Sequence, residues 1–194
     1  MAIKKKTVII VAVIIAFLGI IGVGSGYTVY LRVMAPNVAV QEDVSLYVKP
    51  TFNLDSILVQ TQKLQLFKND GSFEWWANRQ NLGSHLTAGR YVITPGMSNR
   101  AIVNLLMSGR QTPVNVTFNN IRTKADFAGR IGEQLIADSS DFVAYFDSSA
   151  YFSTLGLNKD NFMTIFIPNT YELYWNTDAE GFVKRMAKEH DNFW

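Results

Sequence analysis

The most restrictive feature of the sequence is a long uncharged run near its N-terminus. Residues 7–31 contain no Asp, Glu, Lys or Arg, and residues 8–18 consist only of Val, Ile, Ala, Phe and Leu. As an α-helix rising about 1.5 Å per residue, the run reaches about 37 Å, which exceeds the roughly 30 Å hydrocarbon core of a bilayer. The run therefore predicts a single transmembrane helix over residues 7–31.

The charges that flank this run predict its orientation. Lysines occupy positions 4–6 and Arg32 follows the run, so the positive-inside rule places residues 1–6 in the cytoplasm. A cleaved secretory signal is the alternative, because a lysine-rich start and small residues at 22–26 also suit one. The retained anchor is favoured because a signal's apolar region usually spans about 7–15 residues and no Ala-x-Ala site follows. Both interpretations place residues 35–194 outside the cytoplasm, and the anchor predicts a single-pass protein of a bacterial inner membrane.

The composition excludes several kinds of chemistry. The chain has no cysteine and two histidines, which excludes disulfides, a cysteine nucleophile and a metal cluster of His or Cys ligands. Four of the 18 basic residues precede residue 35, which leaves 14 bases against 16 acids in the remainder. This balance gives no electrostatic basis for nucleic-acid binding, and we expect neither a metal nor another cofactor.

A strand–turn–helix pattern occurs three times after a short predicted stalk at residues 32–43. Each copy has an alternating strand, a helix-capping residue and an apolar helical stripe. The predicted strands are residues 46–48, 91–93 and 114–118, and the predicted caps are Asn53, Ser98 and Thr123. This pattern predicts helices packed on a small sheet, and so an α+β fold.

Three further helices are predicted from apolar periodicity. One covers residues 72–81 and would end at Gly83, and another covers residues 140–146. The last opens with a capping box at residues 177–180, and its apolar stripe consists of Phe182, Val183, Met186 and Phe193. Because this stripe continues to the penultimate residue, we expect a fragment whose continuation packs on residues 178–194.

Carboxylates remain as candidates for catalysis. Lytic cleavage of a glycan strand needs one carboxylic acid, which protonates the glycosidic oxygen and then takes a proton from the sugar's own 6-hydroxyl. Glu172 lies in an aromatic stretch, residues 166–175, where burial would favour the protonated acid and aromatic faces could stack on sugars. A core strand with an ion-paired Glu172 is the alternative. The remaining titratable candidates are expected in structural surface or core-edge roles: Glu74, Glu133, Glu180, Glu189, His85 and His190.

Two motifs carry a family resemblance. Residues 88–98 read AGRYVITPGMS and precede an apolar helix that ends in Ser108-Gly109, and residues 166–172 read FIPNTYE. They resemble the AGxYxxxPGMSxxxIxxxLxxG and FxPDTYE stretches of the YceG-like family, which are membrane-anchored endolytic murein transglycosylases. The resemblance implies a LysM-like module over residues 44–112 and the N-terminal part of an α+β catalytic domain over residues 113–194.

The resemblance also implies a function. The parent protein would cleave nascent peptidoglycan strands at the inner membrane, leave 1,6-anhydro ends and so limit strand length. Its partners would be glycan strands, inner-membrane lipid and the cell-wall synthesis machinery. The family's catalytic glutamate lies in an SIxExE-type helix that would follow Trp194, so this chain would be inactive alone. The substrate-contacting residues implied here are Pro168, Asn169, Thr170, Tyr171 and Glu172.

Three positions depart from the family pattern. Asn119-Asn120 stands where an acid followed by glycine is frequent, Met163-Thr164 occupies another such position, and Asn169 replaces an Asp. A second hypothesis therefore stays open, in which the chain is a non-catalytic, membrane-anchored cell-wall-binding or scaffold protein. Its modules would resemble LysM or POTRA domains, and the repeated strand–helix pattern supports it equally well.

Overall fold

The computed structural model describes residues 5–119, 122–148 and 150–194, with side chains in the first helix described at residues 10, 11 and from 13 onward. It divides into two units. The first comprises Met1–Val44, Asn53–Leu86 and Ile93–Ser108, and the second comprises Ser45–Phe52, Thr87–Val92 and Gly109–Trp194. Residues 1–4 of the predicted cytoplasmic tail, and Asn120 of the pair that departs from the family pattern, lie outside the described residues.

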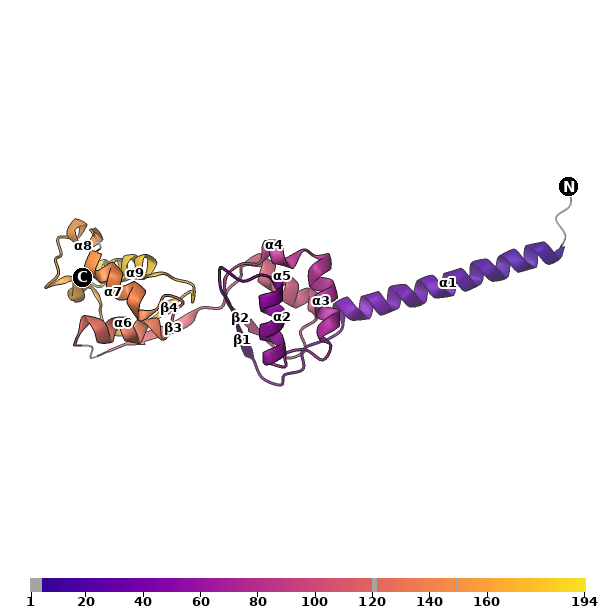
Figure 1. Cartoon of the computed structure of the whole chain (residues 1–194), viewed down its shortest axis with the longest axis horizontal. Coiled ribbons are helices and arrows are strands. Elements are labelled where there is room, and N and C mark those ends of the chain that lie inside the picture. Colours follow the sequence, from indigo (N-terminus) through magenta and orange to yellow (C-terminus); the bar gives the residue numbers. More distant parts are fainter. Residues whose placement is uncertain (1–4, 120–121, 149) are drawn as a thin grey trace. The chain divides into compact units, whose positions relative to one another are not determined.

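Helix α1, Lys5–Met34, is the long apolar helix that the uncharged run predicts (Figure 1). Its segment Val13–Met34 has 22 residues, and the most apolar window within it is 0% buried by the rest of the chain. This length and composition suit a membrane anchor and also a signal sequence. The helix ends just before Ala35-Pro36, because proline has no N–H to donate and disfavours helical geometry in the residue before it.

Four helices form the body of the first unit, and the predicted caps begin two of them. The helices are α2 (Leu54–Lys63), α3 (Asp70–Arg79), α4 (Leu82–His85) and α5 (Asn99–Ser108). The Asn53 side chain accepts a hydrogen bond from the Ser56 N–H at 2.9 Å, and the Ser98 hydroxyl accepts one from the Ala101 N–H at 3.3 Å. Gly109 follows α5 with a left-handed φ of 66°, which ends that helix.

The bounds of α3 correct a prediction. The sequence predicted a helix at residues 72–81 that stops at Gly83, but α3 begins at Asp70 because Asn69 caps the Ser72 N–H at 2.9 Å. It ends at Arg79, and Asn81 adopts a left-handed φ of 53°. Gly83 lies inside α4 instead, so an asparagine makes the turn that we assigned to glycine.

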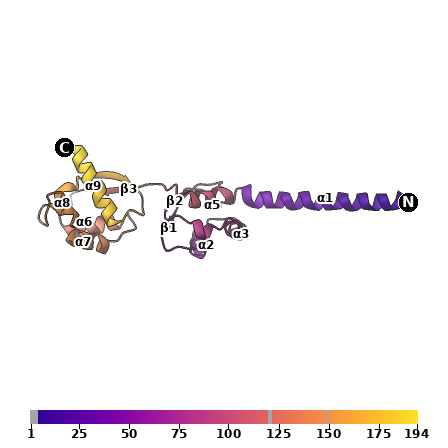
Figure 2. The same ribbon diagram turned by 90° about the horizontal axis from the view of Figure 1, so that it is seen from above.

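The segment that follows α1 lies against the body of the first unit. The expected stalk contains Val33, Asn37 and Val38, and all three are buried. Pro36 forms an isolated bridge with Ser98, and Val38 forms one with Phe67. The last turn of α1 lies beside α3 and α5 (Figures 1 and 2). The body of this unit therefore begins immediately after the apolar helix.

The strands pair in a way that the sequence did not predict. Strand β1 (Val44–Val48) pairs with β2 (Gly89–Ile93), whereas β3 (Val114–Phe118) pairs antiparallel with β4 (Asn169–Leu173). The described residues thus form two two-stranded sheets where we expected one small sheet. Local alternation marks a strand but does not choose its partner, and β4 comes from the motif at residues 166–172.

The core of the second unit is aromatic. Around the β3–β4 sheet lie α6 (Lys124–Gly132), α7 (Ser139–Ser148), α8 (Tyr151–Thr154), the 3-10 helix η1 (Phe162–Ile165) and α9 (Ala179–Phe193). Phe127, on α6, lies near the centre, with ring centroids 4.5 Å from Phe166 and 5.0 Å from Phe118. The other phenylalanines of this cluster are Phe142, Phe146, Phe152, Phe162 and Phe182, all buried.

Helix α9 corrects two further expectations. Its cap is Asp178, which accepts the Gly181 N–H at 2.8 Å, whereas the Thr177 hydroxyl donates to the Tyr174 carbonyl at 2.6 Å. The apolar stripe at Phe182, Val183 and Met186 is buried in the aromatic core of the same unit. Phe193 is the exception, with 64% of its surface exposed. The stripe is therefore covered within the second unit as far as Met186, and packing of a continuation on residues 178–194 stays a prediction.

Candidate functional site

The five predicted contact residues lie on and just before β4, and the strand separates them. Side chains alternate between the faces of a strand, so Tyr171 is buried while Thr170 and Glu172 are exposed. Pro168 and Asn169, at the start of the segment, are also exposed. Glu172 has aromatic neighbours in sequence, but Tyr171 lies on the opposite face of the sheet. The expectation that Glu172 is buried is therefore wrong.

The outer face of the β3–β4 sheet is polar. Thr117 pairs with Thr170 and Asn115 with Glu172, and the hydroxyl oxygens of the two threonines lie 2.8 Å apart. Two hydroxyls, an amide and a carboxylate thus share one exposed face. The hydroxyl and amide groups can donate and accept hydrogen bonds, and the carboxylate can accept them. We call Asn115, Thr117, Thr170 and Glu172 the polar strand face.

Gln134 fixes the outer edge of β3. Its side-chain oxygen accepts the Thr117 N–H at 2.9 Å, and its nitrogen donates to the Thr117 carbonyl at 3.2 Å and to the Arg130 carbonyl at 2.6 Å. Because the main-chain groups of Thr117 point to Gln134, Thr117 and Thr170 form a non-hydrogen-bonded pair, in which side chains approach closely. Hydrogen-bonded and non-hydrogen-bonded pairs alternate along an antiparallel ladder, so Asn115 and Glu172, two positions further along the sheet, also form a non-hydrogen-bonded pair. The main-chain groups of Glu172 therefore point away from β3.

Two hollows lie between β4 and α9. One, of about 400 Å³, is lined by Glu172 and Tyr174 from the strand side and by Arg185 from α9. The other, of about 310 Å³, is lined by Pro168, Asn169, Tyr171, Glu189, Asn192 and Phe193, among others. Four of the five predicted contact residues thus border a hollow beside α9, while Thr170 lies on the polar strand face.

A salt bridge on α9 connects a residue that borders the first hollow with one that borders the second. Arg185 borders the first and Glu189 the second, and the Arg185 Nε lies 2.7 Å from the Glu189 carboxylate. Burial raises the pKa of the Tyr171 hydroxyl, and the negative charge of Glu189 raises it further. The Tyr171 hydroxyl donates to the Ile167 carbonyl at 2.6 Å. Tyr171 therefore stays protonated and holds the chain that enters β4.

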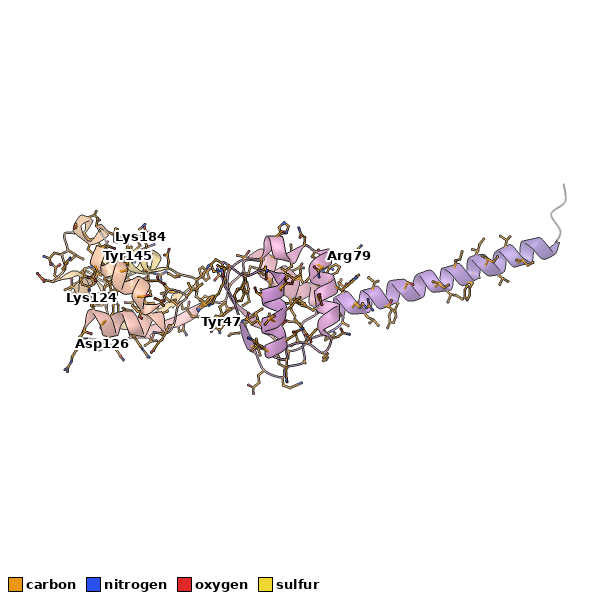
Figure 3. The ribbon with its side chains drawn as sticks, in the orientation of Figure 1. Tyr47, Arg79, Lys124, Asp126, Tyr145 and Lys184 are labelled. Atoms are coloured by element: carbon orange, nitrogen blue, oxygen red, sulfur yellow. The ribbon has the colours of Figure 1, made fainter. Side chains whose placement is uncertain are left out.

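A third hollow lies on another side of the second unit. It has about 600 Å³, and its lining includes Asp141 and Tyr145 from α7 and Glu180 from α9. Figure 3 shows Tyr145 next to Lys184, which pairs with Glu180 at 2.5 Å. This ion pair raises the pKa of Lys184 through a hydrogen bond from the lysine to Glu180 and through the carboxylate's charge. Sequence reasoning did not find this place, because the α7 residues that line it are 31 or more positions from those of α9.

The candidate glutamates Glu172, Glu189 and Glu133 are exposed or paired with a cation. Glu172 is exposed, Glu189 is paired with Arg185, and Glu133 lies 3.7 Å from Arg130 on the surface. A general acid must hold its proton near neutral pH, which requires an apolar environment or a neighbouring negative charge. Within residues 5–119, 122–148 and 150–194, no three His, Cys, Asp or Glu side chains are arranged to hold a metal ion.

Some contributors to the site carried no signal in the sequence. Gln134 and Arg185 look like ordinary surface residues of helical segments, and only the fold brings them to β3 and β4. Among the positions that depart from the family pattern, Asn119 is exposed, and Met163 and Thr164 lie in η1.

The helices and the two small sheets define an α+β protein, which begins with an apolar helix and carries the polar strand face on its β3–β4 sheet. The model of the YceG-like family matches residues 46–194, and the chain belongs to that family. A crystal structure described as a "putative yceG-like protein", lmo1499 from Listeria monocytogenes, is similar at 17% identity and a TM-score of 0.42. The match covers 79% of this chain and 55% of that one, so the chain spans about half the length of that protein. Comparison with curated proteins found no match.

Proposed function

We propose that the parent protein is an endolytic peptidoglycan lytic transglycosylase, and that this chain supplies its membrane anchor and part of its glycan-binding surface. Membership of the YceG-like family over residues 46–194 is the observation that carries this proposal. α1 would cross the inner membrane with its N-terminus in the cytoplasm, and the remainder would lie on the outer side. Tethering confines the protein to the layer where new glycan strands emerge and so raises its effective concentration there.

The polar strand face would bind the glycan. Thr117, Thr170 and Glu172 would form hydrogen bonds to hydroxyl and amide groups of the sugars, and the hollows beside α9 would receive their bulkier substituents. Residues 168–172 would then form one wall of a groove. The sheet is held by Gln134 on one edge and by the aromatic core beneath it, so the face is preorganised for binding.

The reaction itself needs one carboxylic acid. The acid gives its proton to the glycosidic oxygen as the C–O bond breaks, and the sugar's 6-oxygen bonds to C1 while its proton returns to the carboxylate. No water is consumed, and the product is a 1,6-anhydro sugar. By family resemblance, this acid lies in a segment that would follow Trp194. The described residues of this chain would hold the strand during the reaction.

Binding is tested with the full chain and purified sacculi. We expect the chain in detergent to sediment with sacculi, and the double variant Thr170→Val/Glu172→Gln to bind about tenfold more weakly, as expected for losing one or two hydrogen bonds to the sugar. The matched control is Thr154→Val/Glu133→Gln, which changes the same residue types at exposed positions away from β4. Equal binding by both variants would exclude the polar strand face as the glycan site.

Cleavage needs a separate test. The parent protein, extended through the catalytic segment, is incubated with uncrosslinked glycan strands, and the products are analysed by mass spectrometry for anhydro ends. If sacculi bind but no anhydro-ended product forms, the second hypothesis of a wall-binding or scaffold protein is favoured. The exposure of Glu172 and the pairing of Glu189 are the observations on its side.

A further inference from the structure

A buried polar cluster ties the end of the apolar helix to the first unit. Asn99 has 0% of its surface exposed. Its amide nitrogen donates to the Arg32 carbonyl at 2.7 Å and to the Ser72 hydroxyl at 3.0 Å, and its oxygen accepts from the Asn37 amide at 2.8 Å. The last turn of α1 is therefore joined to α5 and α3 by hydrogen bonds that water cannot easily replace.

The same cluster gathers two loops around the chain that leaves α1. The Asn37 side chain donates to the Asn69 carbonyl and accepts the Asn69 N–H, both at 3.0 Å. Its main chain accepts the Lys68 N–H at 2.8 Å and donates to the Met97 carbonyl at 3.0 Å. Loops 66–69 and 94–98 thus meet at the residue three positions beyond the helix. The body is held at the helix end without a flexible spacer.

Three exposed cationic residues belong to this cluster or lie next to it in the sequence. Arg32 supplies a carbonyl to it, Lys68 precedes Asn69, and Arg100 follows Asn99. An Arg100 guanidinium nitrogen lies 3.9 Å from the Met34 sulfur, which keeps this side chain beside α1. Asp70, partly buried at the start of α3, is an acidic neighbour in sequence. Within the described part of the chain, none of the three cations forms an ion pair.

The uncharged run of α1 sets the level of these cations. It covers residues 7–31 and ends directly before Arg32, so a bilayer that holds this run places Arg32 at the outer boundary of its hydrocarbon core. Tyr27 and Tyr30, both exposed on α1, suit the outer interface of such a membrane. Beyond the hydrocarbon lies a headgroup layer of about 5–8 Å. Asn99 and Arg100, which contact Arg32 and Met34, would lie at this level.

We propose that this end of the first unit is a lipid-binding surface, on which Arg32, Lys68 and Arg100 bind the phosphate groups of anionic lipids. The proposal rests on the proposed insertion of α1 in a membrane. The polar cluster would hold the main chain of these three residues in place, so that binding costs little loop ordering. Lipid binding would then fix the orientation of the first unit on the membrane surface.

The test uses the full chain in nanodiscs of phosphatidylcholine with or without phosphatidylglycerol. Hydrogen exchange is followed in peptides that cover residues 66–70 and 96–101, with residues 139–148 of α7 as an internal reference. Lipids that stay bound after extraction are counted by native mass spectrometry. Each cation near an anionic surface favours binding by about fivefold, so Lys68→Gln/Arg100→Gln should lower phosphatidylglycerol enrichment by up to about 25-fold.

The matched control removes the same charge from the second unit, as Lys159→Gln/Lys188→Gln. We expect phosphatidylglycerol to slow exchange at residues 66–70 and 96–101 in the wild type and in this control, but not in Lys68→Gln/Arg100→Gln. Resistance of the chain to an alkaline carbonate wash reports insertion of α1 separately. An inserted chain without lipid-dependent protection, or an equal loss in both variants, would overturn the lipid-binding surface alone. A chain released by the wash would overturn the anchor and the lipid surface with it.

Discussion

Asn37 and Asn99 are 62 positions apart in the sequence and are joined by a buried hydrogen bond of 2.8 Å. Asn37 follows the apolar helix and Asn99 begins α5, so this bond connects the segment after α1 to the folded body. Neither asparagine stands out in the sequence, because each lies beside a turn where asparagine is common. Their burial shows that they have a tertiary role.

Replacing Asn99 tests how much this hydrogen-bonded cluster contributes to the free energy of unfolding. Asn99→Ala removes three hydrogen bonds and leaves the Arg32 carbonyl without its amide donor, so we expect a loss of about 2–3 kcal/mol in unfolding free energy. Asn104, on the exposed side of α5, gives the matched control Asn104→Ala, which should change stability by less than about 0.5 kcal/mol. Urea unfolding of the chain in detergent measures both, and similar values would show that the cluster contributes little.

Phe127 should be among the most sensitive positions of the second unit. It is 1% exposed and contacts Phe118, Phe146, Phe166 and Phe182. Phe127→Ala should cost about 3–5 kcal/mol, since it removes a large apolar side chain from a packed core and leaves a cavity. Phe193→Ala, at a site that is 64% exposed, should cost under about 0.5 kcal/mol. Comparable losses in the two variants would contradict the burial of Phe127 and the exposure of Phe193.

Local sequence signals predicted where helices and strands occur better than they predicted which strands pair and which elements pack together. Asn53 and Thr123 begin helices as predicted, because a cap depends on residues within one turn. The helix stop at Gly83 and the cap at Thr177 were wrong, since Asn81 and Asp178 satisfy the same geometry nearby.

The candidate site shows the same limit. The motif at residues 166–172 contains most of β4, and the period of two along the strand separates its exposed side chains from its buried ones. The pairing of β4 with β3, and the approach of Gln134, depend on contacts across 17 to 53 positions. The alternation separates Tyr171 from Glu172, but which of the two faces is buried depends on these long-range contacts, which explains why the burial of Glu172 was predicted wrongly.

Protonation of Asp138 should make the stability of the second unit depend on pH in the acidic range. A hydrogen bond from the Ser140 hydroxyl, followed by those from the main-chain N–H groups of Asp141 and Ser140, holds the pKa of Asp138 below its ordinary value of 3.8. A group with a lowered folded-state pKa contributes stability above the unfolded pKa, and this contribution is lost as the pH falls through the folded pKa.

The measurement is a carboxyl carbon NMR titration of Asp138 together with acid unfolding. Asp138→Asn keeps an acceptor for the N–H groups of α7 but cannot titrate, so its stability should fall less steeply below pH 3.8 than that of the wild type. Asp126→Asn, at the exposed start of α6, is the comparison. Identical acid profiles in wild type and Asp138→Asn would contradict this role.

Tyr171 should give the opposite dependence, at alkaline pH. Burial, and then the charge of Glu189, raise its pKa above the ordinary value of 10.0. Its contribution to stability is therefore complete below pH 10.0 and is lost as the pH rises through the folded pKa. Glu189→Gln should lower this pKa towards 10.0 without reaching it, because burial is the larger cause. Tyrosinate absorbance, taken as the difference from Tyr171→Phe, follows this one group, and an unchanged titration in Glu189→Gln would refute the charge effect.

Gln134 supports the polar strand face from the edge of β3. Its amide satisfies both main-chain groups of Thr117, at 2.9 and 3.2 Å, so it takes the place of a neighbouring strand. Gln134→Met keeps the size of the side chain and removes these two bonds together with the one to the Arg130 carbonyl, and we expect a loss of about 1–2 kcal/mol. Hydrogen exchange at the Thr117 amide should accelerate more than exchange at Val116, whose main chain pairs with Tyr171 in β4. Because the threonine pair depends on this geometry, the glycan binding that we propose for this face should also weaken. Wild-type exchange at Thr117 in the variant would show that β3 keeps its position without Gln134.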